Sequence, residues 1–246
     1  MSDTSPFPPP IPPQVPRTSP ESGTLPLGHG EQERVPVSGF MTAIESILRQ
    51  PRRIIYQLRQ GGQAGLIARL LIISLACGLI YGAVVGTFSR GDQLWAAPVK
   101  VAAGLLISAL ICLPSLYIFS CLSGSQARLI EVLGLLAGLL ALTTVLLIGF
   151  APVAWVFSES TKSLPAISAL HLAFWLIATY FGLRFLGTGF AHLSASGTGL
   201  KVWVIVFLLV SLQMTTALRP IVGKADTFLA ADKKFFVSHW LDCLKD

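Results

Sequence analysis

The residues able to do chemistry are few, and their spacing matches no known catalytic or metal-binding arrangement. Cys77, Cys112, Cys121 and Cys243 form no Cys-x-x-Cys or Cys/His spacing, so neither a metal site nor a disulfide framework is indicated. The chain also lacks a His-Glu-x-x-His motif, a glycine-rich phosphate loop and a Gly-x-Ser-x-Gly elbow. We therefore predict no catalytic residue, no metal and no cofactor.

Ionisable residues within apolar runs are the next candidates, because a charge at membrane depth is costly and usually has a purpose. Glu131, preceded by Arg128, fits either an interfacial ion pair or a carboxylate at a helix N-terminus. Arg184 lies near the end of an apolar run, from which its side chain can snorkel to the interface. His171 lies deepest, and both a proton relay and a hydrogen-bonded packing role remain open.

Glycines recur at four-residue spacing in two apolar runs. Gly78, Gly82 and Gly86 form one series, and Gly134 and Gly138 form a shorter one. Small residues at this spacing give a smooth helix face that another helix can approach closely within lipid. The partner helix could belong to a second copy of the chain or to the same bundle.

The composition indicates which elements must position these residues. Of the 246 residues, 53% are hydrophobic and only 12% are charged, about half the charged share of soluble domains. The mean hydropathy is +0.69. Such a chain lacks the charged surface that would cover a soluble core. The sequence predicts an all-α, polytopic transmembrane helical bundle whose main partner is the lipid bilayer.

The apolar runs predict about five spans. At about 1.5 Å per residue, roughly 20 residues cross a hydrocarbon core of about 30 Å. Within the third span, Pro152 is expected to end or kink the helix. Within an expected bundle of 61–223, the spans are placed at about 66–88, 99–122, 129–157, 166–186 and 202–218.

The segments outside the spans differ in character. Residues 1–37 are rich in proline, which fixes φ and removes backbone donors, and so predict a disordered tail. Residues 38–60 predict amphipathic helices, capped by Ser38 and interrupted at Pro51, that lie in the membrane interface, pack on the spans, or do both. Residues 224–246 predict a short amphipathic C-terminal tail.

The basic residues favour lipid as a partner rather than nucleic acid. The formal net charge is +6, but the basic residues are not interleaved with exposed aromatic residues. Arginines before the first span suit anionic headgroups and predict a cytoplasmic N-terminus. They are Arg49, Arg52, Arg53 and Arg59.

The plan of a proline-rich tail followed by five spans resembles the Yip1 family of membrane proteins. The stretch Ile47-Leu48-Arg49-Gln50-Pro51-Arg52-Arg53-Ile54-Ile55 is similar to the proline-containing helix that precedes the spans in bacterial members. The Asp-Leu-Tyr-Gly-Pro motif of eukaryotic relatives is absent. Two further segments look like those of uncharacterised bacterial multi-span proteins, 112–117 and 213–223. The resemblance implies residence in a bacterial inner membrane and carries over no catalytic residue.

The tail, the glycine faces and the missing catalytic groups together favour a non-enzymatic protein. We expect it to organise or regulate other membrane components, with other membrane proteins or copies of itself as partners. The alternative is a small transporter or channel subunit built around His171 and Glu131.

Overall fold

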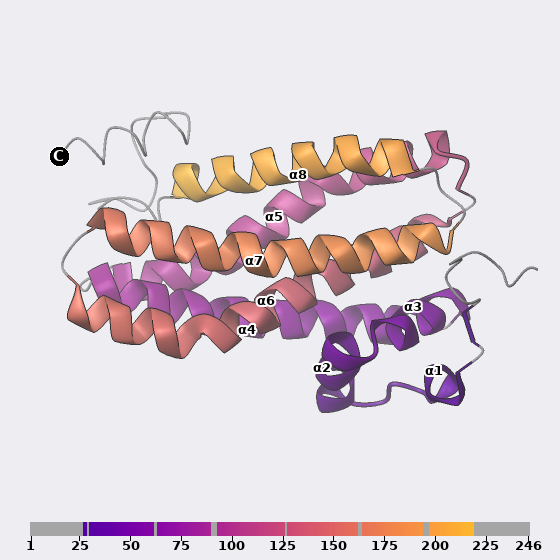
Figure 1. The fold of residues 1–246 in the computed structure, drawn as a ribbon, viewed down its shortest axis with the longest axis horizontal. Helices are drawn as coiled ribbons and strands as arrows, with labels where there is room; N and C mark the ends of the chain where they lie inside the picture. The colour runs from indigo at the N-terminus through magenta and orange to yellow at the C-terminus, as the bar shows by residue number, and fades with distance from the viewer. Residues whose placement is uncertain are drawn as a thin grey trace, which may run out of the picture.

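The fold is a bundle of five long helices with three short helices against one flank (Figure 1). The computed structural model describes residues 27–28, 30–61, 63–89, 93–125, 127–161, 164–193 and 197–218. These residues contain no strand. The predicted class, an all-α multi-span bundle, is confirmed.

The bundle helices begin and end close to the predicted spans. Four of them are long and apolar enough to cross a membrane, and the fifth carries a shorter apolar stretch, Gly199–Met214. Among the described residues, about five spans is therefore a consistent count. The helices are α4 (Ala64–Ser89), α5 (Gln93–Leu122), α6 (Leu129–Ser160), α7 (Leu164–Ala191) and α8 (Gly197–Leu218).

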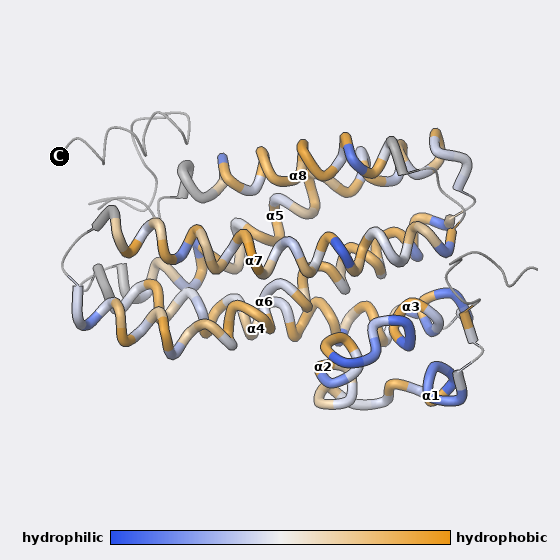
Figure 2. Tube along the Cα trace, in the orientation of Figure 1, coloured by the Kyte–Doolittle hydropathy of each residue, from blue (hydrophilic) through white to orange (hydrophobic). Residues whose placement is uncertain are grey.

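Helix α6 forms the centre of the bundle, with α4 and α7 packed most extensively against it. An unbroken run of its residues is buried from Gly134 to Thr144, because small and branched apolar residues occupy every face there. The outer helices expose large apolar side chains instead, such as Leu110, Tyr180 and Ile205. Figure 2 shows hydrophobic residues along all five helices, which makes the outer surface suited to lipid.

Prolines lie inside these helices without ending them. Helix α6 runs through Pro152 to Ser160, and α5 contains both Pro98 and Pro114. The expectation that Pro152 could end the third span is therefore wrong. A helix in lipid must keep its backbone groups bonded within the segment, which favours continuing past a proline over unwinding.

Three short helices precede the bundle: α1 (Glu31–Arg34), α2 (Phe40–Arg49) and α3 (Pro51–Arg59). The predicted break at Pro51 is confirmed, with Pro51 at the first position of α3. The predicted cap is wrong by one residue, since Gly39 occupies the N-cap of α2 and makes no side-chain bond. Helix α1 falls inside the stretch expected to be tail, and it packs on α3. Residues 1–26 and 219–246, which include most of both predicted tails, lie outside the described residues.

The helices alternate in direction, so the bundle has two distinct ends (Figure 1). We call the end where α4 begins the near end, and α1–α3 lie on the flank beside it. Helices α4 and α6 end at the far end, and α5 and α7 begin there. Helix α8 finishes at the far end, as an odd number of crossings requires.

Candidate functional site

The three short helices form a layer, here called the flank layer (residues 31–59), that docks on the bundle through apolar side chains. Ile47, Ile54, Ile55 and Leu58 are all almost fully buried. Leu58 packs over Gly134 of α6 so closely that an added Cβ would come within 2.6 Å of its Cδ2 atom. Helices α2 and α3 therefore pack against the spans, which was one of the two roles predicted for them.

Arginine side chains fix the flank layer further by donating to backbone carbonyls. Arg69 of α4 donates to the Val37 carbonyl at 2.6 Å, and Arg59 donates to the His192 carbonyl at 3.2 Å. Arg53 donates to the carbonyls of Val35 and Pro36, at 2.9 and 3.1 Å. Three of these bonds satisfy the carbonyls of Val35, Pro36 and Val37 in the non-helical segment before α2, which therefore follows one defined path.

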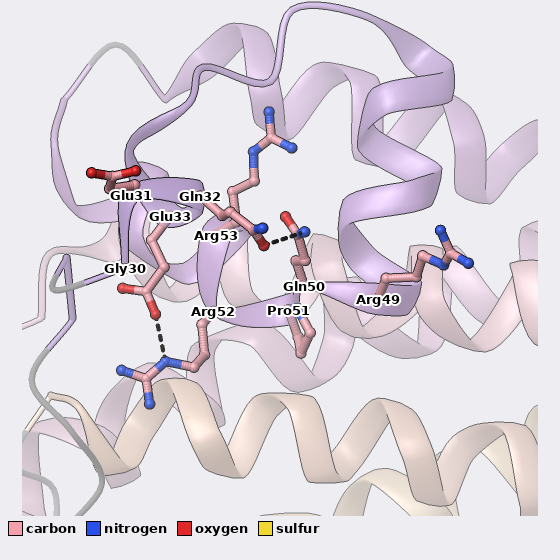
Figure 3. A pocket seen from close by; sticks show the side chains of 9 residues that line it. All are labelled: Gly30, Glu31, Gln32, Glu33, Arg49, Gln50, Pro51, Arg52 and Arg53. Atoms are coloured by element: carbon pink, nitrogen blue, oxygen red, sulfur yellow. Dashed lines mark hydrogen bonds and ion pairs between the residues drawn. The ribbon is translucent and has the colours of Figure 1, made fainter.

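A polar pocket of about 580 Å³ lies between α1 and the α2–α3 corner (Figure 3). Arg52 donates to Glu33 at 2.7 Å across it, and the Gln50 amide donates to Gln32 at 2.9 Å. Burial acts to raise the pKa of Glu33, but the bond from the Gly28 N–H and the Arg52 charge outweigh it and lower that pKa. The pocket thus holds its carboxylate ionised beside an arginine.

Helix α2 also carries apolar side chains on the side that faces away from the bundle. Phe40, Met41 and Leu48 share one side of the helix, and Met41 is 80% exposed. The polar residues Glu45 and Arg49 lie on a separate stripe and pair with each other at 3.4 Å. Helix α2 thus packs one set of apolar side chains on the bundle and leaves another set exposed, as helices in a membrane interface do.

A second pocket, of about 490 Å³ and mainly apolar, lies where the α2–α3 corner meets α6 and α7. Pro51 and Arg52, at the start of α3, line both pockets. Leu142 and Phe181 contribute apolar walls to the second pocket. Arg184 of α7 also lines it, so this predicted candidate lies near Arg52 rather than alone on the bundle surface.

His171 is buried at 2% exposure and bonds to a residue that the sequence did not single out. Its Nδ1 atom lies 2.8 Å from the hydroxyl of Tyr81, also 2% exposed, and the two rings meet edge-on at 5.8 Å. Trp175 and Leu147 belong to the apolar cluster around this pair. Tyr81 was missed because a tyrosine in an apolar run is usual near the membrane interface.

Lys100 is the other residue that sequence reasoning missed. It falls at the start of the predicted second span, where a lysine is expected to reach the headgroups, yet it is only 1% exposed. Helix α5 begins at Gln93, so Lys100 lies about two turns inside the helix. Tyr81 and His171 also lie about two turns from the far end, so three buried polar residues share one depth.

Glu131 takes a structural position. Its carboxylate accepts from the Arg128 backbone N–H at 3.1 Å, in a capping box at the start of α6. That arrangement corresponds to the helix N-terminal carboxylate among the predicted alternatives. Glu131 lies at the near end, whereas His171 lies towards the far end, so the structure does not bring these two candidates together.

The glycine series face neighbouring helices of the same chain. A Cβ on Gly82 would lie 2.5 Å from the Pro98 Cα atom, and one on Gly78 would lie 3.4 Å from Ala102. Gly86 is buried in the same helix. Of the predicted alternatives, the contacts at Gly78 and Gly82 correspond to packing within the bundle.

The second glycine series behaves in the same way. Gly134 meets Leu58 of the flank layer, and a Cβ on Gly138 would lie 2.5 Å from the Phe185 ring of α7. These glycines serve the docking of α3 and α7 on the central helix.

Among the described residues, no group of three or more His, Cys, Asp or Glu side chains could hold a metal ion. Comparison of the chain with protein-family models, curated proteins and solved structures finds no match in any of the three. The length and composition of the described helices indicate that the chain is a multi-pass integral membrane protein whose bundle contacts the lipid bilayer.

Proposed function

We propose that the protein is a non-enzymatic organiser that gathers other membrane components on its flank layer. The observation that carries the proposal is the firm docking of α2 and α3 on the bundle, by buried Ile47 and Leu58 and by arginine–carbonyl bonds, with α1 packed on α3. A layer fixed in this way keeps its outward groups in a constant geometry relative to the spans. Preorganised surfaces bind partners at lower entropic cost than flexible ones.

The chemistry of the outward surface also suits this role. Phe40, Met41 and Leu48 offer apolar contact area, and the neighbouring polar pocket offers arginines. Aromatic residues, methionine and arginine are enriched at protein interfaces. Partners at this surface would be membrane proteins that share the same interfacial depth.

We further propose residence in a bacterial inner membrane with a cytoplasmic N-terminus and a Yip1-like relationship. The support is the cluster of arginines in α2 and α3 beside the start of α4, together with the proline-broken amphipathic pair. Cytoplasmic segments near the spans carry an excess of arginine and lysine. Labelling of a single cysteine at Met41 from either side of sealed vesicles tests the orientation.

Site-specific photocrosslinking in native membranes tests the organiser role. A photoreactive residue at Met41 is expected to give a discrete protein adduct, and one at Leu110, 67% exposed on α5, is expected to give lipid adducts. Leu58→Ala, which removes the side chain packed on Gly134, is expected to weaken the Met41 adduct. Lipid adducts alone at both positions would contradict the proposal.

The buried residues near the far end favour a second candidate, a small transporter or channel subunit. Tyr81, His171 and Lys100 lie at one depth on three helices, and buried ionisable residues often mark ion or proton pathways. In proteoliposomes this candidate predicts proton or ion flux that His171→Ala abolishes and Lys201→Gln leaves unchanged. Flux equal to that of empty liposomes would exclude it.

A further inference from the structure

The polar pocket and the apolar pocket share Pro51 and Arg52 as lining residues, so charged and apolar side chains are close to one another there, as a lipid would need. One compartment is lined by arginine, glutamate and glutamine side chains. The other runs between α6 and α7 past Leu142, Leu146 and Phe181. We infer that this two-part groove binds one anionic phospholipid, with the phosphate between Arg52 and Arg184 and one acyl chain along the apolar walls.

The charge of the groove favours an anion. Four arginines line its two parts, namely Arg49, Arg52, Arg53 and Arg184, against the glutamates Glu31 and Glu33. The positive end of the α3 helix dipole lies at Pro51, between the two compartments. Within the described chain, Arg184 has no ion pair and its helix position is exposed. A phosphate there would neutralise the charge of the Arg184 guanidinium.

The depth of the groove favours a lipid over a soluble anion. Helix α6 has 32 residues and is about 48 Å long, which exceeds the hydrocarbon core of about 30 Å. The flank layer covers the near-end part of α6, and Arg184 lies about two turns from the near end of α7. The groove therefore lies near the boundary between headgroups and acyl chains.

The groove is also open towards the bilayer. Leu48 is 45% exposed and Phe181 is 44% exposed, while Ile47 and Phe185 are buried and form its floor. An acyl chain lying there would cover the two exposed side chains, and a soluble phosphate would not. Basic pockets of this kind between spans suit anionic headgroups. The inference requires membrane insertion but not the organiser role, so either can fail without the other.

Native mass spectrometry of the detergent-purified full chain tests the site. Phosphatidylglycerol and phosphatidylethanolamine with identical acyl chains are titrated in parallel. We expect one phosphatidylglycerol to bind in preference. Arg184→Gln is expected to weaken its binding about fivefold, the effect of one arginine near a charged headgroup, while leaving phosphatidylethanolamine unchanged. Lys201→Gln removes a positive charge at the same end of the bundle and serves as the matched control.

Three further measurements separate the contributions of charge and acyl chain to the affinity. Phe181→Ser is expected to weaken both lipids equally, because it alters the acyl wall and not the charge. Inorganic phosphate in excess is expected not to displace the lipid. Arg184→Lys keeps the charge and is expected to retain most of the preference.

Three results would overturn the inference. Equal binding of the two lipids would remove the anion preference. Equal losses from Arg184→Gln and Lys201→Gln would indicate diffuse surface attraction instead of a groove. Full displacement by inorganic phosphate would indicate a soluble-anion site.

Discussion

Two close contacts at glycines show how differently the two ends of the molecule are built. Towards the far end, Gly82 of α4 faces the backbone of α5, with Pro98 Cα 2.5 Å from an added Cβ. On the near flank, Gly134 of α6 faces the flexible tip of the Leu58 side chain at 2.6 Å. Backbone cannot move aside without shifting a whole helix, whereas a leucine tip can rotate. An added methyl group should therefore be tolerated less well at Gly82 than at Gly134.

The polar contacts also differ between the far end and the flank layer. Tyr81 and His171 are sealed in apolar surroundings and rely on one hydrogen bond. The flank layer spreads its stability over several exposed arginine bonds to carbonyls. Several separate bonds thus hold the flank layer in place, whereas one hydrogen bond joins the buried pair.

The largest effect is expected from Gly82→Ala. The added Cβ meets backbone, so the free energy of unfolding should fall by about 1–3 kcal/mol, as overpacking typically costs. Gly134→Ala should cost less than about 1 kcal/mol, because the Leu58 tip can shift. Thermal unfolding in detergent measures both.

Gly149→Ala is the matched control, because nothing lies within 4 Å of its added Cβ. It should leave stability unchanged or raise it by about 0.5–1 kcal/mol, through the helical preference of alanine. Equal effects at Gly82 and Gly149 would contradict the close approach of α4 and α5.

Breaking the buried pair is expected to have the next largest effect. Tyr81→Phe removes the hydroxyl and leaves the His171 Nδ1 atom without its partner, which should cost about 1–3 kcal/mol of unfolding free energy. Combining Tyr81→Phe with His171→Phe in a double-mutant cycle should give a coupling energy of about 0.5–3 kcal/mol. Strictly additive losses would mean that the two side chains do not interact.

Arg53→Ala should have a smaller and local effect. It removes two bonds to the carbonyls of Val35 and Pro36, both at exposed positions, and should loosen the segment before α2 by about 0.5–1.5 kcal/mol. Limited proteolysis is expected to cut near that segment faster, while the melting of the spans stays constant. A lowered melting temperature of the whole bundle would contradict this local role of Arg53.

The smallest expected effect is a pH dependence of α1 docking. Because the folded pKa of Glu33 lies below its usual 4.5, the ionised carboxylate stabilises the docked state above that pH. Docking should therefore weaken as the pH falls from about 4.5 through the lowered pKa. The mobility of a spin label at Glu31 is expected to rise over that range.

Glu33→Gln provides the control, since the amide cannot titrate. In this variant the spin label at Glu31 should keep the same mobility over that pH range. A rise of equal size in this variant would assign the effect to another group, such as His192, whose pKa is lowered by burial and by the Arg52 and Arg59 charges.

Much of the fold could be predicted because each span must bury apolar length in lipid. The first and third expected spans lie within about three residues of the boundaries of α4 and α6, whereas α5 begins at Gln93, before the expected start at about 99. The break at Pro51 follows from its missing N–H. Helix α1 could not be predicted in this way. The stretch Glu31–Arg34 has no apolar period, and it is held by contacts to α3.

What the sequence determined by itself was therefore local and additive: hydropathy, helix length, proline breaks and the side chains able to carry charge. The tertiary structure decided which helix each glycine faces, that Lys100 is buried, and that His171 meets Tyr81. It also decided that Arg52 and Arg184, which lie far apart along the chain, line one pocket. The physical reason is that lipid favours any apolar helix orientation about equally, so only side-chain packing between helices selects the rotation and neighbours of each one.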